Sequence, residues 1–320
     1  MDQAGQIAEQ LLEPLRAGDP RALARAISWV ENGYPGARAL MAALWPTLGR
    51  AEVIGLTGAP GAGKSTLTDQ LARTLRKEGR KVGILAVDPT SPYTGGAILG
   101  DRIRMGRASE DSGIFIRSMA TRGALGGLAR ATQDAIDLLD AAGFDTILLE
   151  TVGVGQDEVD VVACVQTCCV VLVPGLGDGV QALKAGIMEV ADLFIINKAD
   201  RDGADQVEQE IEGLKSLGPI GLDPAWDPPV TRTVASTGEG VEALLAAIRT
   251  HEVWLKQGDG LARKAKARAK LRLEALLAEE ATRRAKARAG QERMASLIDR
   301  IAERKLDPYA AVEELLGGEG

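Results

Sequence analysis

Seven short apolar segments, separated by longer stretches of mixed polarity, constrain the fold of this chain more than any other feature. They show little of the alternation between apolar and polar side chains that marks a half-exposed strand. Strands of that kind are buried on both faces, which is typical of a parallel sheet covered by helices on both sides. The pattern therefore predicts an α/β fold with a mostly parallel sheet. The segments are VIGLT (53–57), KVGILAVD (81–88), GIFIRS (113–118), FDTILLE (144–150), CCVVLVP (168–174), LFIINKAD (193–200) and VTRTVAS (230–236).

Helical segments are expected before and after this α/β region. Up to about residue 48, leucine, isoleucine and valine recur at the spacing of an amphipathic helix. Beyond His251 the strand pattern stops, and a stretch rich in Ala, Leu, Lys, Arg and Glu predicts long helices. We therefore expect an N-terminal helical extension over residues 1–48, the α/β domain over 49–252 and a C-terminal helical region over 253–320.

The charge and hydropathy of the chain argue against two classes of binding protein. The net charge is −7, which disfavours a general binder of nucleic acid or of anionic membranes. In residues 263–272 six of ten side chains are Lys or Arg, but a solvated helix face explains such a run better than a nucleic-acid site. No run of about 18 apolar residues occurs, and the N-terminus lacks the basic-then-apolar order of a secretion signal. We expect a cytoplasmic protein with no nucleic-acid or membrane partner.

Three cysteines, Cys164, Cys168 and Cys169, lie within six residues of one another. Their place beside an apolar run favours small buried side chains over a disulfide framework. A metal site there would need a fourth ligand, and the single histidine, His251, is distant in the sequence. We therefore expect no metal centre at the cysteines.

A phosphate-binding loop follows the first predicted strand. Residues 58–65 read GAPGAGKS, which matches G-x-x-x-x-G-K-[ST] between a strand and a helix, an order that a chance glycine-rich turn would not be expected to show. The glycines let backbone N–H groups converge on phosphates, and the helix N-terminus favours an anion. Lys64 is expected to reach the β- and γ-phosphate oxygens, and the Ser65 hydroxyl to bind Mg²⁺. The residues predicted to hold the phosphates are Gly58, Gly61, Ala62, Gly63, Lys64, Ser65 and Thr66.

The sequence NKAD at 197–200, which ends the sixth predicted strand, predicts recognition of guanine. Asp200 can accept hydrogen bonds from both the ring N–H and the exocyclic amine of guanine, whereas adenine would leave the carboxylate unpaired. Asn197 is expected to face the other polar edge of the base, and the Lys198 stem to lie along its plane. GTP and GDP are therefore the predicted substrate and product.

Acidic residues after other apolar segments are candidates to bind Mg²⁺ and to sense the γ-phosphate. Glu150 ends the fourth predicted strand in the sequence ETVG, where the Gly153 N–H would meet the γ-phosphate. Asp88 in AVDPTSP and Asp101 in TGGAILGDRIRM follow further apolar runs. The ordinary alternatives are a turn residue for Asp88 and a helix cap or surface charge for Asp101. The predicted catalytic group is Lys64, Asp88, Asp101, Glu150 and Gly153, and the predicted Mg²⁺ site is Ser65, Asp88, Asp101 and Glu150.

Six longer stretches carry a more specific signal: PGAGKST, VDPTSPYTGGAILGDRIRM, RSMATRGALGGLARAT, ETVGVGQDEVDV, VLVPGLGDGVQALKAGIMEVAD and NKADRDGAD. Together they resemble the methylmalonyl-CoA mutase-associated GTPases, over about residues 1–310. The resemblance implies a P-loop GTPase that is slow alone and stimulated by an adenosylcobalamin-dependent acyl-CoA mutase. Its GTP hydrolysis would gate cofactor loading and would protect or reactivate the mutase. The resemblance also implies Mg²⁺, a homodimer built on the C-terminal helices, and an adenosyltransferase as a further partner.

Three positions depart from the pattern of that family. The family usually has histidine where Ala124 stands, an acidic residue where Gly179 stands and serine where Val234 stands. Ala235 keeps the position whose backbone N–H faces the guanine keto oxygen. The departures therefore bear on communication with the mutase more than on GTP binding. In the family, the stretch at 174–184 acts as an additional switch, and here it offers the polar side chains of Asp178, Gln181 and Lys184.

Three other functions are alternatives to this one. A GTP-dependent nickel-insertion protein needs a metal site rich in His and Cys, and this chain has a single histidine. An ATP-using small-molecule kinase is opposed by the NKAD sequence. A nucleotide-gated binding protein with negligible turnover remains open, because GTPases that borrow a catalytic group from a partner are slow alone. The sequence has no cobalamin-binding D-x-H-x-x-G motif, so we expect partners to bind that cofactor.

Overall fold

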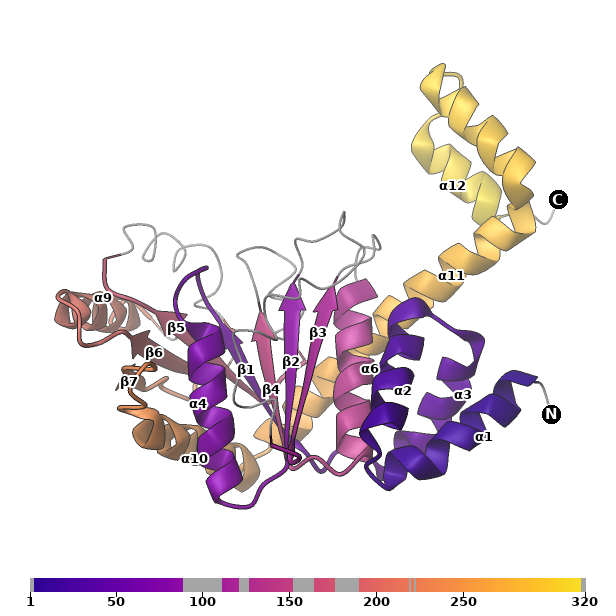
Figure 1. Ribbon diagram of the computed structural model, residues 1–320. Helices are drawn as coiled ribbons and strands as arrows, with labels where there is room; N and C mark the ends of the chain where they lie inside the picture. Colours follow the sequence, from indigo (N-terminus) through magenta and orange to yellow (C-terminus); the bar gives the residue numbers. More distant parts are fainter. Residues whose placement is uncertain are drawn as a thin grey trace. The chain divides into compact units, whose positions relative to one another are not determined.

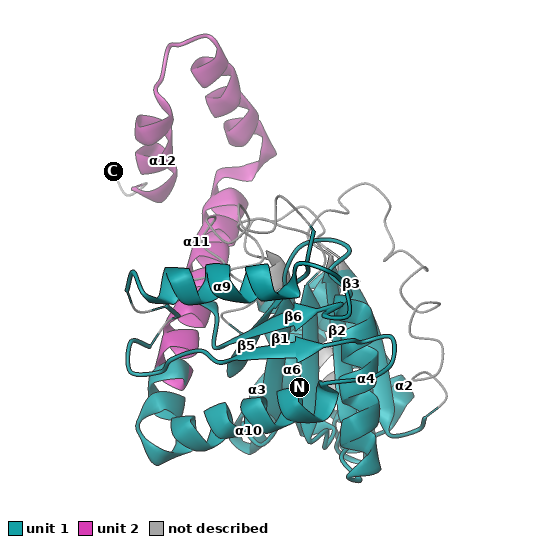
Figure 2. Ribbon diagram, turned by 90° about the vertical axis from the view of Figure 1, so that its left-hand side faces the viewer, with its two compact units in different colours: residues 1–264 teal, residues 265–320 magenta. Residues whose placement is uncertain are grey.

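A computed structural model of the protein describes residues 3–88, 111–120, 127–151, 164–175, 190–218, 220–221 and 223–317. Two units divide the chain, Met1–Lys264 and Ala265–Gly320 (Figure 2). The first unit holds the sheet and the helices packed against it, and the second holds the C-terminal helices. The domain boundaries expected after residues 48 and 252 stay predictions.

The first unit is built around a parallel sheet whose strand order is β3-β2-β4-β1-β5-β6-β7 (Figure 1). Every strand pair in it is parallel, which confirms the predicted fold class. β1 lies at the centre between β4 and β5, with its Leu56 opposite Glu150 on β4 and Cys169 on β5. The strands are β1 (Glu52–Thr57), β2 (Val82–Asp88), β3 (Ile114–Ala120), β4 (Thr146–Thr151), β5 (Thr167–Leu172), β6 (Leu193–Asn197) and β7 (Val230–Thr233).

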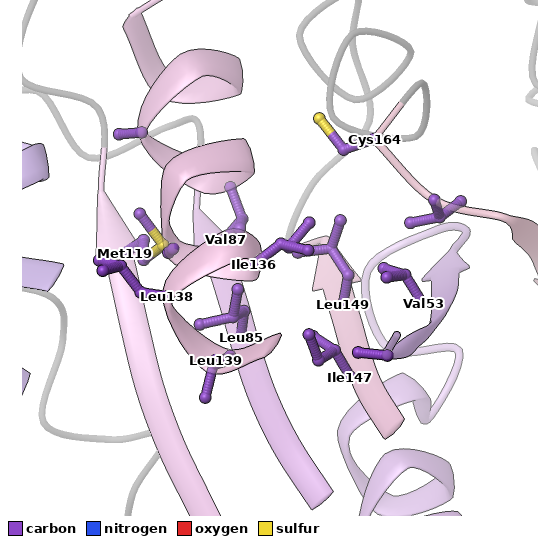
Figure 3. Packing of buried hydrophobic residues seen from close by; sticks show 14 of the residues in the cluster. Val53, Leu85, Val87, Met119, Ile136, Leu138, Leu139, Ile147, Leu149 and Cys164 are labelled. Atoms are coloured by element: carbon purple, nitrogen blue, oxygen red, sulfur yellow. The ribbon is translucent and has the colours of Figure 1, made fainter. Parts of the chain in front are cut away.

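Successive residues of each central strand point into two different cores, one on each face of the sheet. In β1, Val53 belongs to one cluster and Ile54 to the other; in β6, Phe194 and Leu193 divide in the same way. Figure 3 shows part of the first cluster, in which side chains of the strands meet those of the covering helix. Burial on both faces explains why the strand segments read as continuous apolar runs.

Helices cover both faces of the sheet. The first face is covered by α6 and α9, and the second by α4 and α10. Gly127 begins α6, while Lys64, the lysine of the phosphate-loop motif, begins α4. The bounds are α4 (Lys64–Lys77), α6 (Gly127–Ala141), α9 (Ala204–Lys215) and α10 (Val241–Gln257).

The N-terminal helices extend the core of the first face. Their apolar side chains join the cluster that contains α6, and α2 packs directly on that helix. Arg117 on β3 pairs with Glu31 of α2 and donates to the Ser28 hydroxyl at 3.1 Å. Near the start of β1, the Asp140 carboxylate of α6 accepts the N–H of Ala51 at 2.9 Å. The elements are α1 (Gln3–Arg16), α2 (Pro20–Asn32), α3 (Pro35–Leu44) and the 3-10 helix η1 (Trp45–Thr47).

The C-terminal region is helical, as the sequence predicts. α11 (Gly260–Ala302) breaks at Gly290, which has a φ of 74°, and α12 (Pro308–Leu316) returns beside it. Arg300 pairs with Glu314 across these helices. Among the helices that the structure describes, none is both long and apolar enough to cross a membrane.

A buried polar cluster lies at the amino ends of β5 and β6. The His251 ring of α10 is fully buried, with Nδ1 2.9 Å from the Thr167 hydroxyl and Nε2 3.3 Å from Asp192 Oδ1. Lys264, in the first turns of α11, donates to Asp192 Oδ2 at 2.7 Å and to the Gln166 carbonyl at 2.6 Å. Within the basic run at 263–272, Lys264 is therefore held against the sheet by the charge of the buried Asp192 and does not belong to the solvated face that the sequence predicts.

The charges around Asp192 favour its ionised form. Burial opposes ionisation, but the nearby His251 ring and the charge of Lys264 outweigh burial and hold the pKa of Asp192 below its usual value. The Cys168 N–H also donates to Asp192 Oδ2 at 2.8 Å. This carboxylate therefore stabilises the fold most where it is ionised.

The three cysteines are buried and unbridged, as expected from the sequence. Cys168 and Cys169 point to opposite faces of β5, because one belongs to each apolar cluster. Burial raises the pKa of both thiols. They therefore act as small apolar side chains.

The Asp192 cluster predicts a pH-dependent stability. Lys264→Met should lower the free energy of unfolding by about 3 kcal/mol at pH 7, because it leaves a buried carboxylate short of a counter-charge. Lys266→Met, on the same helix but at an exposed position, should change it by less than about 0.5 kcal/mol. Urea unfolding followed by circular dichroism measures both.

The sign of the pH effect follows from the lowered pKa of Asp192. Its contribution is present above the unfolded pKa of about 3.9 and is lost as the pH falls through the folded value. The stability difference between the wild type and Asp192→Asn should therefore shrink between pH 6 and pH 3. A constant difference over that range would contradict this role of Asp192.

Candidate functional site

The candidate site lies at the carboxyl edge of the sheet, where parallel strands place their following loops together. The phosphate-binding loop follows β1, and Glu150 lies near the end of β4. Asn197 ends β6, and Ala235 follows β7. Because β1, β4, β5, β6 and β7 are neighbours in the sheet (Figure 1), these four parts of the sequence meet at one edge.

The backbone of the phosphate-binding loop requires glycine at two positions. Gly58 has a φ of 140°, and a Cβ atom there would lie 2.2 Å from the Val171 carbonyl oxygen. Gly63 has a φ of 88°, and a Cβ atom there would lie 2.4 Å from Asn197 Nδ2. Any other residue would therefore be strained and would displace β5 or the Asn197 side chain.

Lys64 folds back over the phosphate-binding loop. Its side chain is buried, and Nζ donates to the carbonyl oxygens of Gly58 and of Ala59, the latter at 3.1 Å. The ammonium group therefore lies against the loop whose N–H groups are expected to bind phosphate. This position suits a contact between Lys64 and a phosphate oxygen.

Ser65 and Glu150 form a second polar pair at this edge. The Ser65 hydroxyl donates to Glu150 Oε1 at 2.5 Å, and the Glu150 side chain is buried in β4. A hydroxyl and a carboxylate are oxygen ligands that Mg²⁺ prefers, and Mg²⁺ in nucleotide sites needs only one or two protein ligands. The donor set therefore fits Mg²⁺. No group of three or more His, Cys, Asp or Glu placed to hold a metal occurs among the described residues.

Asn197 links the phosphate-binding loop to the loop after β7. Its Nδ2 donates to the Ala62 carbonyl at 2.8 Å, and its Oδ1 accepts the Thr233 hydroxyl at 3.2 Å and the Ala235 N–H at 3.1 Å. The side chain is almost wholly buried. Sequence reasoning placed Asn197 at the edge of the base, and missed this link because it depends on contacts with distant segments.

The other residues of the NKAD sequence lie around Asn197. Lys198 has a φ of 56°, unusual for a residue with a side chain, and its Nζ donates to the Gly61 carbonyl at 2.7 Å. Asp200 is exposed in the turn after β6. The Ala199 N–H donates to the Thr233 carbonyl at 3.1 Å, which ties this turn to β7. The contact of the Ala235 N–H with a guanine keto oxygen stays a prediction.

Gln70 is a residue of this site that sequence reasoning missed. It lies on α4, and its Nε2 donates to the Ala235 carbonyl at 3.1 Å. A glutamine in the helix after a phosphate-binding loop carries no signal by itself, because glutamine is an ordinary helix former.

Several predicted site residues are not placed. Asp88 is the last residue of β2, so its backbone lies at the carboxyl edge, but its side chain is outside the description. The other such residues are Asp101, Ala124, Gly153, Asp178, Gly179, Gln181 and Lys184, which lie outside the described residues. Their roles stay predictions.

Comparison with known proteins identifies one family, two similar proteins and one similar solved structure. A family model described as methylmalonyl Co-A mutase-associated GTPase MeaB matches residues 23–290. A Pyrococcus horikoshii protein described as a GTPase is 46% identical over 316 residues, which cover 96% of this chain and 97% of that protein. A Caenorhabditis briggsae protein described as a mitochondrial methylmalonic aciduria type A homolog is 37% identical over 265 residues, which cover 77% of this chain and 63% of that protein. Among solved structures, a LAO/AO transport system kinase is 26% identical with a TM-score of 0.72, covering 98% of this chain and 97% of the other.

The link made by Asn197 predicts a large effect on stability. Asn197→Ala should lower the free energy of unfolding by about 2 to 4 kcal/mol without any nucleotide, because it leaves three buried polar groups, from two segments, without their partner. Lys198→Ala is a matched control, since its contact is exposed and should contribute less than about 0.5 kcal/mol. Urea unfolding measures both, and equal stabilities of the two variants would contradict the link.

Proposed function

The chain belongs to the methylmalonyl-CoA mutase-associated GTPase family, and we propose that it hydrolyses GTP as the accessory chaperone of an adenosylcobalamin-dependent acyl-CoA mutase. The GTPase activity rests on the family and on the P-loop fold. The observation that carries the nucleotide proposal is the direct connection between the two halves of the site. Asn197 and Lys198 both donate to carbonyl groups of the phosphate-binding loop, so base and phosphates would be read by one connected unit.

Guanine selectivity is assigned to Asp200. Its carboxylate is exposed in the turn after β6, two residues beyond Lys198. Two hydrogen bonds to an ionised acceptor favour guanine, and adenine would instead leave the carboxylate without its partner.

Hydrolysis requires mainly positioning and charge stabilisation of the γ-phosphate. Lys64 supplies a fixed positive charge at the phosphate-binding loop. Ser65 and Glu150 are the described residues that would hold Mg²⁺, with Asp88 and Asp101 as further candidates, and Gly153 would meet the γ-phosphate. When bound, Mg²⁺ would neutralise charge that develops on the phosphate oxygens.

The role toward the mutase rests on the family. The family is associated with methylmalonyl-CoA mutase, and the Caenorhabditis briggsae relative bears the name of methylmalonic aciduria type A. We assign to GTP hydrolysis the gating of cofactor loading and the protection or reactivation of the mutase, with an adenosyltransferase as a further partner. Slow turnover alone and faster turnover with the mutase follow from a catalytic group supplied in trans.

A homodimer through α11 is part of the proposal. Leu273 and Leu277 of this helix are 68% and 66% exposed and stand one turn apart. Exposed leucines gathered on one helix indicate a covered surface.

The base-recognition proposal is tested by Asp200→Asn. The variant should lose affinity for GDP by at least about a hundredfold and should gain affinity for xanthosine diphosphate, whose carbonyl would meet the new amide donor. Isothermal titration with GDP, xanthosine diphosphate and ADP measures this. Equal affinity of the wild type for GDP and ADP would refute the guanine site.

The same variant tests the mutase role. With the acyl-CoA mutase of the same organism present, the Asp200→Asn protein should load cofactor with xanthosine triphosphate and not with GTP, while the wild type shows the reverse. Phosphate release and the visible spectrum of bound cobalamin follow the two steps. Cofactor loading that is the same with GTP and with xanthosine triphosphate, in both the wild type and the variant, would refute the gating role.

The dimer is tested by Leu273→Glu combined with Leu277→Glu. Two charges in a covered apolar surface should turn a dimer into a monomer under light scattering. Leu217→Glu, at a position that is 83% exposed in the first unit, should leave the dimer intact. A dimer that survives the double substitution would place the interface elsewhere.

A further inference from the structure

The loop that follows β7 is held at Ala235 from two sides. The Ala235 N–H donates to Asn197 Oδ1 on β6 at 3.1 Å, and the Ala235 carbonyl accepts from Gln70 Nε2 on α4 at 3.1 Å. Ala235 itself is 4% exposed. Water therefore has little access to replace either partner, and both peptide groups beside Ala235 depend on these side chains for their orientation.

The rest of this loop is a tight turn that leaves Ala235 at its base. The Val234 N–H donates to the Glu239 carbonyl at 3.0 Å, and the Gly238 N–H donates to the Val234 carbonyl at 2.9 Å. Gly240 has a φ of 78°, and a Cβ atom there would lie 2.0 Å from the Arg232 carbonyl oxygen. The turn is thus closed on itself, while Val234 has no hydroxyl with which to hold a neighbouring loop.

Gln70 connects this turn to the helix of the phosphate-binding loop. α4 begins at Lys64, and Gln70 follows six residues later on the same rigid element. Gly238 lies beside the glutamine, because a Cβ atom there would be in ordinary contact with Gln70 Oε1 at 3.5 Å. The amide of Gln70 therefore sets the position of Ala235 relative to the phosphate site.

We propose that Gln70 is a positioning residue for base recognition, which holds the Ala235 carbonyl so that the N–H of the same residue faces the 6-keto oxygen of the purine. This inference rests on the proposed guanine site and adds to it a residue on α4. Asn197 Oδ1 holds the Ala235 N–H in the absence of a base, and a keto oxygen beside Asn197 would share or take over that N–H group. Gln70 acts on the opposite side of the same residue and keeps the N–H directed into the site.

The proposal makes the effect of Gln70 depend on one atom of the ligand. GDP and inosine diphosphate both carry the keto oxygen, whereas 2-aminopurine riboside diphosphate lacks both the keto oxygen and the ring N–H and keeps the exocyclic amine. Its affinity is therefore lower in every variant, and the comparison is the ratio of variant to wild type for each nucleotide. Gln70→Ala should weaken binding of GDP and of inosine diphosphate by the same factor, about fivefold, as expected for one neutral hydrogen bond. Binding of the 2-aminopurine nucleotide should stay within about twofold of the wild type. The preference for GDP over inosine diphosphate should also stay, because Asp200 reads the amine.

Two further variants separate positioning from a structural effect on the helix. Gln70→Lys keeps a donor of sufficient length and should restore most of the affinity for GDP, whereas Gln70→Glu has the same size but no donor and should not. Lys77→Ala, at an exposed position of α4, is the control for changes in helix stability. The affinities are measured by calorimetry for GDP and inosine diphosphate and by fluorescence for the 2-aminopurine nucleotide.

The outcomes distinguish this inference from the proposed function. If the wild type prefers GDP to ADP and Gln70→Ala weakens all three nucleotides equally, Gln70 acts on the phosphate-binding loop and the positioning role is overturned. If Gln70→Ala changes none of them, the contact with Ala235 has no role in binding and the inference fails alone. If the wild type does not prefer GDP to ADP, the proposed guanine site fails and the inference fails with it.

Discussion

The structure depends first on a parallel sheet that is buried on both faces. Val53 and Ile54, or Leu193 and Phe194, enter different cores, so each central strand is fixed from both sides and its side chains cannot serve as a surface site. Polar side chains that could bind a ligand therefore lie at the ends of the strands. At the carboxyl edge this brings together loops that are far apart in the sequence, which is the reason the phosphate-binding loop and the NKAD sequence can form one candidate site.

Within that site, the Asn197 amide makes hydrogen bonds to other parts of the protein in addition to its expected contact with the base. It reaches Ala62 on one side and Ala235 on the other, and the absence of a Cβ atom at Gly63 makes the first of these approaches possible. A phosphate-binding loop joined in this way to the base-reading loop cannot shift without disturbing Asn197. Gln70 adds a second connection from α4. In the proposed site, base recognition and phosphate recognition are thereby coupled through packed polar contacts.

Much of the fold and of the candidate site could be predicted from the sequence, because the apolar runs and the motifs that indicate them are local. The apolar runs gave the strands, and the spacing of glycines before Lys64 gave the loop. Contacts between distant segments could not be predicted. In the sequence, Gln70 is an ordinary helical residue, and only the structure shows its contact with the loop after β7. Lys264 is one charge of a basic run in the sequence, and only the structure shows its ion pair with Asp192. The roles of Asp88, Asp101 and Gly153 still rest on the sequence, since their side chains or whole residues lie outside the described part of the chain.

The two polar clusters meet in one short strand. β6 begins directly after Asp192, which is held by His251 and Lys264, and it ends with Asn197, which is held at the nucleotide site. Because side chains alternate along a strand, a slip of one residue would reverse the faces of Phe194 and its neighbours. The same slip would pull Asp192 out of its buried ion pair. The register of β6 is therefore fixed by apolar burial along its length and by buried hydrogen bonds at both ends, and the position of the NKAD residues follows from that register.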